Sequence, residues 1–98
     1  MRTPEGYERQ YIERYLRSTG AWFCHPVTMG YGNNGAPDLI CCSQGRFVAI
    51  EVKREGKGPT PLQQLRIEEI KKAGGFATWG TAEKVIPELA IWLASDGR

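Results

Sequence analysis

The sequence predicts a single α/β domain whose elements follow the order αβββαβα. Three observations carry this expectation: an apolar stripe at helical spacing near the N-terminus, two strand-like runs around a short central turn, and two well-signalled helices later in the chain. With 98 residues and 41% hydrophobic content, the chain has room for one hydrophobic core. We therefore expect residues 1–98 to form one domain.

The N-terminal segment carries the signals of a helix followed by a short strand. Thr3 can cap a helix that has Pro4 in its first turn, and Gly20 should end it. Between them, apolar residues recur at helical spacing: Tyr7, Tyr11, Ile12, Tyr15 and Leu16. We expect these tyrosines, like Trp92, to lie in the core. The apolar stretch 21–28 then reads as a short or edge strand because it contains Pro26.

Two firmer strands are expected in the middle of the chain, after a glycine-rich loop at residues 30–37. Residues 38–42 (DLICC) and 47–53 (FVAIEVK) flank Ser43-Gln44-Gly45-Arg46, a spacing typical of a tight hairpin.

Helix signals follow the hairpin. Thr60-Pro61-Leu62-Gln63 has the form of a capping box, which opens a helix that runs to about Ala73. Residues 76–79 form a last short strand, and a final helix runs from Thr81 to near Ala94. We expect this helix to be jogged or restarted at Pro87.

Composition excludes several functional classes. No apolar run is long enough to span a membrane, and the N-terminus lacks the apolar core of a secretory signal, so we expect a soluble, intracellular protein. The three cysteines, Cys24, Cys41 and Cys42, form no CxxC pair and are expected to be reduced core residues on strands, without a disulfide or zinc. His25 has no serine or cysteine partner at recognisable spacing, which favours a structural role.

Charge permits a nucleic-acid partner without requiring one. The net charge is only +2, but the basic residues cluster in two groups: Arg9, Arg14 and Arg17, and Lys53, Arg54 and Lys57.

The hairpin predicts a pair of neighbouring carboxylates. If its turn is centred between Gln44 and Gly45, opposed residues have numbers that sum to 89, which places Asp38 opposite Glu51. Two carboxylates ~5 Å apart repel each other by about 3 kcal/mol at an effective dielectric near 20. Either one carboxyl group stays protonated, or a hard divalent cation lies between them. Lys53 lies two residues beyond Glu51 and therefore on the same face of the strand.

These residues also resemble a known family. Gly35-Ala36-Pro37-Asp38 followed by Ile50-Glu51-Val52-Lys53 resembles the PD-(D/E)XK nuclease signature, and the segment 32–75 resembles a VRR-NUC domain of the stand-alone, virus or phage type. The match covers essentially the whole chain. The resemblance implies a restriction-endonuclease-like αβββαβ core, in which a mixed central sheet is flanked by helices, with a C-terminal helix added.

The resemblance also implies a set of site residues. It assigns Asp38 and Glu51 as ligands of Mg²⁺, for which Mn²⁺ substitutes, with the Val52 carbonyl as a further ligand. Lys53 would assist the attacking water. A helical glutamate best matched by Glu8, with Glu5 one turn earlier as the alternative, and a glutamine matched by Gln63 complete the set. The residues expected to contact DNA are Arg9, Gly32, Gly35, Arg54 and Lys57.

The expected function is therefore metal-dependent endonucleolytic cleavage of branched DNA, such as Holliday junctions. We expect the protein to act as a homodimer in the cytoplasm of a bacterial or phage-infected cell. No organic cofactor and no membrane partner are expected. A flap or single-strand nuclease remains an alternative. So does a non-catalytic nucleic-acid-binding or assembly module on the same fold, and so does a hydrolase that uses the carboxylates as an acid/base dyad. Gln63 also has an open structural alternative, because a capping box would use its side chain to bond the Thr60 N–H.

Overall fold

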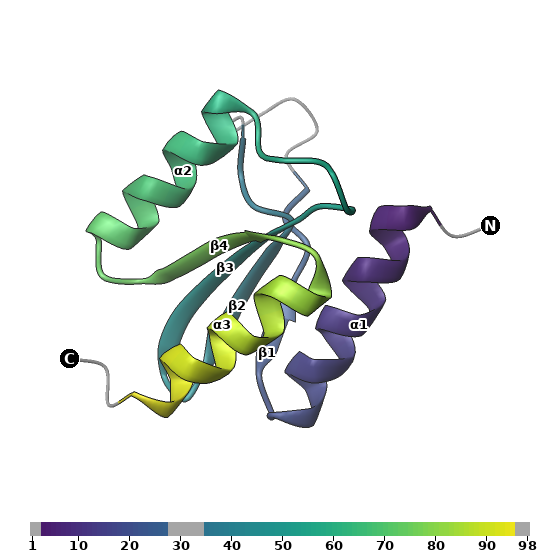
Figure 1. Cartoon of the computed structure of the whole chain (residues 1–98). Coiled ribbons are helices and arrows are strands. Elements are labelled where there is room, and N and C mark those ends of the chain that lie inside the picture. The colour runs from purple at the N-terminus through teal and green to yellow at the C-terminus, as the bar shows by residue number, and fades with distance from the viewer. Residues whose placement is uncertain (1–2, 28–34, 96–98) are drawn as a thin grey trace.

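Figure 1 shows the computed structural model, which describes residues 3–27 and 35–95. The elements follow the predicted order αβββαβα, with these bounds: α1 Pro4–Ser18, β1 Trp22–Cys24, β2 Leu39–Ser43, β3 Arg46–Val52, α2 Pro61–Lys72, β4 Phe76–Gly80 and α3 Ala82–Ala94.

The four strands form one mixed sheet in the order β1-β2-β3-β4. The pairs β1–β2 and β2–β3 are antiparallel, whereas β3 and β4 run parallel and are connected by α2. Helix α2 lies over one face of the sheet, while α1 and α3 lie together over the other (Figure 1). This architecture confirms the predicted α/β fold with a mixed central sheet and a C-terminal helix.

Each helix begins where a threonine precedes it. The Thr3 hydroxyl accepts the Gly6 N–H at 3.0 Å, and the Thr81 hydroxyl accepts the Lys84 N–H at 3.3 Å. At α2 the predicted capping box is complete. These bonds satisfy backbone donors that have no partner within the helix, which is why the three starts could be located from the sequence.

The two faces of the sheet carry cores of different size. The α1/α3 face holds the larger aliphatic cluster, which includes Val48, Ile50 and Val52 from β3, and the α2 face holds a small cluster of Ala49, Ile67 and Ala77. Because side chains alternate along a strand, residues 48, 50 and 52 face one core while 49 and 51 face the other.

One expected break is absent, because α3 runs without interruption through Pro87. Proline removes one backbone hydrogen bond, but Val85, Leu89 and Leu93 are buried on both sides of it and hold the helix against the sheet. Pro87 itself is exposed, so water can solvate the carbonyl left without a donor.

Two expectations about the core were too broad. Tyr7 and Tyr11 are 53% and 52% exposed, because only Ile12 and Leu16 of α1 point fully inward. Tyr15 and Trp92 are partly buried against the larger core, and Cys42 is exposed although Cys41 is buried.

No described helix is long and apolar enough to cross a membrane.

Candidate active site

The β2–β3 hairpin fixes the position of the two predicted carboxylates. Its two-residue turn has φ of 54° at Gln44 and 74° at Gly45, the left-handed backbone that a tight hairpin turn of the primed type requires. The register pairs Leu39 with Ile50, so the partner numbers sum to 89 as predicted. Asp38 directly precedes Leu39 and therefore lies beside Glu51, which directly follows Ile50.

Asp38 is held in place by the edge of β3 and by the loop that leads to it. Its Oδ2 accepts the Val52 N–H at 2.9 Å. The loop passes close to α2 at Gly35, where φ is +78° and an added Cβ would lie 2.9 Å from Leu62 Cγ. Glycine is thus required here for a close approach within the protein.

Glu51 is the most perturbed acid of the site. It is 4% exposed, and its Oε1 is buried with no hydrogen-bond partner among the described residues. The pKa of Glu51 is raised to about 8: burial is the largest cause, repulsion by Asp38 and hydrogen bonding with it act in the same direction, and Lys53 acts in the opposite direction. A carboxyl with these surroundings requires either a proton or a cation.

Lys53 and Gln63 both interact with Glu51 through its other oxygen. Lys53 Nζ lies 3.7 Å from Glu51 Oε2, and Gln63 Nε2 donates to the same oxygen at 3.2 Å. The opposite end of the Gln63 amide accepts the Thr60 N–H at 2.9 Å. The two readings of Gln63 are therefore compatible, because one side chain caps α2 with its oxygen and contacts Glu51 with its nitrogen.

The donor set fits a hard divalent cation. Asp38 and Glu51 offer carboxylate oxygens on one face, and the unpartnered Glu51 Oε1 is a buried acceptor that lacks compensation. Among residues 3–27 and 35–95, no three histidine, cysteine or acidic side chains gather as a metal site. Two carboxylates, completed by water and a substrate phosphate, are a usual environment for Mg²⁺.

Glu8 takes part in a contact between helices. Its Oε1 accepts the Ala82 N–H at 2.8 Å, at the first residue of α3. A carboxylate is stabilised there by the unpaired amides and the positive end of the helix dipole. This bond links α1 to α3, and the role of Glu8, or of the alternative Glu5, in holding a metal stays a prediction.

The residues expected to contact DNA are spread over several segments. Arg54 and Lys57 are exposed on the loop between β3 and α2, and neither forms an ion pair with a described acidic residue. Arg9 is half-buried on α1, and its Nε lacks a hydrogen-bond partner in the described part of the chain. Gly32 lies outside the described residues.

Other residues have structural contacts. His25 Nε2 lies 2.9 Å from Glu13 Oε2, and its ring meets that of Phe23 edge-on.

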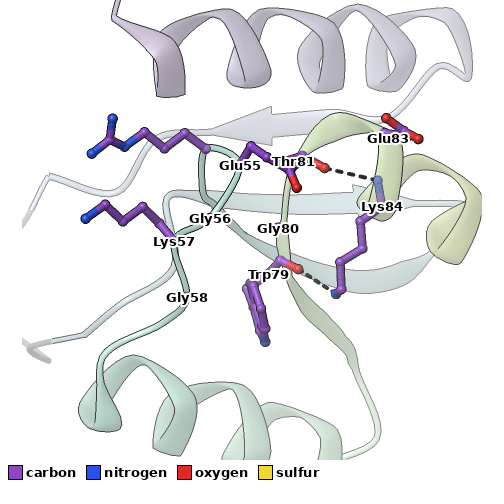
Figure 2. Close-up of a pocket in the computed structure, with 10 residues that line it drawn as sticks. Glu55, Gly56, Lys57, Gly58, Trp79, Gly80, Thr81, Glu83 and Lys84 are labelled. Atoms are coloured by element: carbon purple, nitrogen blue, oxygen red, sulfur yellow. Dashed lines mark hydrogen bonds between the residues drawn. The ribbon is translucent and has the colours of Figure 1, made fainter.

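The structure adds a cleft that sequence reasoning missed. Figure 2 shows it between the loop 54–58, the end of β4 and the start of α3, with a volume of about 690 Å³. Trp79 lines this cleft and is paired with Glu51 in the parallel register of β3 and β4. The hairpin register predicts that Asp38 lies beside Glu51. The residue beside Glu51 on the neighbouring strand β4 could not be predicted, because β3 and β4 are joined by a crossover and no local sequence signal sets their register.

Comparison with known proteins agrees with this geometry. No protein-family model matches the sequence, and no curated protein matches it. A solved structure described as "VRR_NUC domain" is similar, with a TM-score of 0.76 and 26% sequence identity over 91% of this chain and 96% of that chain. The likeness extends over nearly all of this nuclease-type fold and supports the resemblance seen in the motifs. In three dimensions, as in its motifs, this chain is similar to a VRR-NUC domain.

Proposed function

We propose that this protein is a Mg²⁺-dependent endonuclease that hydrolyses phosphodiester bonds in branched DNA. The observation that carries the proposal is the buried Glu51 beside Asp38, with one oxygen unpartnered and the other contacted by Lys53 and Gln63. This constellation joins two oxygen ligands for a cation to a movable positive charge, which is suited to phosphate chemistry.

Each residue has a distinct role in the proposed reaction. Asp38 and Glu51, with the Val52 carbonyl, would hold Mg²⁺ or Mn²⁺, whose chemistry is to polarise the scissile phosphate and to make water more acidic. Lys53 carries a compact ammonium group that stabilises the negative charge developing on the phosphate. Gln63 fixes the orientation of the Glu51 carboxylate from the start of α2.

A substrate panel tests this function. Labelled Holliday junction, flap, duplex and single-strand DNA, with matched RNA strands, are incubated with Mg²⁺, Mn²⁺, Ca²⁺ or EDTA. We expect cleavage of branched DNA in Mg²⁺ and Mn²⁺, none in EDTA, and none by Glu51→Gln. Undiminished cleavage in EDTA or by Glu51→Gln would overturn the proposal, and binding of all substrates without cleavage would identify a non-catalytic module.

We also propose that the active species is a homodimer, because resolution of a four-way junction needs two symmetric cuts and each chain carries one site. Apolar surface is available for pairing: a groove of about 660 Å³ beside β4 is lined in part by Phe76, Trp92 and Ile91, of which Ile91 is 74% exposed.

Light scattering tests the assembly directly. We expect a mass about twice that of the 11.0 kDa chain, together with linearisation of a cruciform plasmid. A monomer that only nicks the plasmid would contradict the dimer and favour a flap or single-strand nuclease.

A further inference from the structure

The cleft in Figure 2 lies directly beside the candidate metal site. Lys53 and the loop 54–58 continue from the end of β3, and Gly80 and Thr81 continue from the end of the parallel strand β4. Crevices at the carboxyl ends of parallel strands are common ligand sites in α/β sheets. A DNA strand whose phosphate lies at Glu51 therefore has an adjacent nucleotide within reach of this cleft, because neighbouring strands are only about 4.8 Å apart.

Trp79 gives the cleft an aromatic wall. Its indole is half-buried, and Lys84 Nζ lies 4.7 Å from the ring centroid. The loop opposite the indole has no bulky side chain at Gly58, where an added Cβ would still be 3.9 Å from Trp79 Cη2. The Gly58 backbone thus passes close to the edge of the indole without adding a side chain that would cover the ring.

The charges in the cleft are unevenly distributed. Lys84 is compensated by Glu88, whose Oε2 lies 3.2 Å from its ammonium group. Arg54 and Lys57 carry positive charges with no ion-pair partner among the described residues, and Lys57 extends away from Glu83 in Figure 2. Glu55, on the same loop, and Glu83, on α3, also line the cleft, so Arg54 and Lys57 together leave the loop with an excess of one positive charge.

We propose that this cleft binds one unpaired nucleotide next to the scissile phosphodiester, with its base stacked on Trp79 and its phosphate held by Arg54 and Lys57. The inference rests on the proposed function, which places the scissile phosphate at Glu51. Stacking on an aromatic side chain requires a base that has left the duplex stack, so the cleft binds a nucleotide that is unpaired, or becomes unpaired, at the branch point. It tolerates any base, because every base has an aromatic face.

Binding of a flap oligonucleotide tests the cleft independently of cleavage. The flap carries the fluorescent base 2-aminopurine at the first unpaired position, and binding is followed in Ca²⁺ and in EDTA. We expect the wild-type protein to quench this base. Trp79→Leu should bind about tenfold more weakly with the quenching lost, and Trp79→Phe should restore most of both.

Matched variants separate this effect from general damage. Trp22→Leu removes an indole that is 64% exposed on β1, and Lys72→Ala removes an exposed lysine at the end of α2; neither residue lines the cleft. Both should bind the flap as the wild type does, whereas Lys57→Ala should bind more weakly and with a smaller salt dependence. Circular dichroism and light scattering check that the variants keep fold and mass.

The outcomes distinguish the cleft from the nuclease function. If the wild type cleaves DNA but Trp79→Leu, Trp79→Phe and Lys57→Ala all bind like the controls, the nucleotide site is wrong and the nuclease is not. If Trp79→Leu does not fold, the other two variants decide. Trp79→Phe must then keep most of the binding and quenching, whereas Lys57→Ala must bind more weakly. If the wild type cleaves nothing while flap quenching depends on Trp79, the cleft is supported and the proposed catalytic function is overturned.

Discussion

The two faces of β3 differ in kind although their residues alternate along a single strand. Toward α1 and α3 the strand presents Val48, Ile50 and Val52, all fully buried among aliphatic side chains. Toward α2 it presents Ala49 and then Glu51, a buried acid with a raised pKa. The contrast shows how a small domain can tolerate a destabilising site: one face supplies apolar burial, which offsets the cost of carboxylates concentrated on the other.

The largest effect on stability is expected on the aliphatic face. Ile50→Ala should lower the free energy of unfolding by about 2–5 kcal/mol, because it removes fully buried methyl groups and leaves a cavity. Urea unfolding followed by circular dichroism measures this loss. Val27→Ala, at a site that is 76% exposed, is the control and should change stability by no more than about 0.5 kcal/mol. Equal losses would remove the distinction between core and surface on which the comparison rests.

At Glu51 we expect the opposite effect on stability, because here the native side chain destabilises the folded protein. Its pKa is raised from 4.5 to about 8 in the folded protein, so the folded state binds a proton more tightly than the unfolded state. The metal-free protein should therefore lose stability as pH rises from about 4.5 to about 8, by no more than about 5 kcal/mol.

Glu51→Gln should flatten this pH dependence and be the more stable protein at pH 8. Thermal unfolding in EDTA between pH 4.5 and 9 measures both curves. Parallel curves for the wild type and the variant would show that ionisation of Glu51 does not destabilise the metal-free protein.

A smaller effect should separate the two functions of Gln63. Gln63→Ala removes both the cap and the contact with Glu51, and should cost about 1 kcal/mol of stability together with activity. Gln63→Glu keeps an oxygen that can accept the Thr60 N–H but replaces the amide donor with a carboxylate oxygen facing Glu51. It should therefore lose activity, and it should retain more of the stability than Gln63→Ala only at pH values below the raised pKa of Glu51, where Glu51 is protonated. Unfolding midpoints and initial cleavage rates provide the comparison. An active Gln63→Glu protein would leave Gln63 as a cap alone.

Local chemistry explains which parts of the fold could be predicted. Thr3, Thr60 and Thr81 locate helix starts because their hydroxyls bond amides three residues away. The Gln44-Gly45 turn fixes the β2–β3 register in the same local way, and the placement of Asp38 beside Glu51 follows from it.

Features that depend on distant packing could not be predicted. The continuity of α3 through Pro87 depends on burial of Val85 and Leu89, and the exposure of Tyr7 depends on where α1 lies relative to α3. The bond from Glu8 to Ala82 and the pairing of Glu51 with Trp79 join segments that have no shared local signal.

Calorimetric titration with Mn²⁺ at pH 8 tests the central claim that Asp38 and Glu51 form the metal site. The account predicts that the wild type binds Mn²⁺, that Asp38→Asn and Glu51→Gln lose this binding while remaining folded, and that Lys53→Ala retains it although it no longer turns over substrate. Unchanged Mn²⁺ affinity in both carboxylate variants, or loss of affinity in Lys53→Ala, would contradict the account.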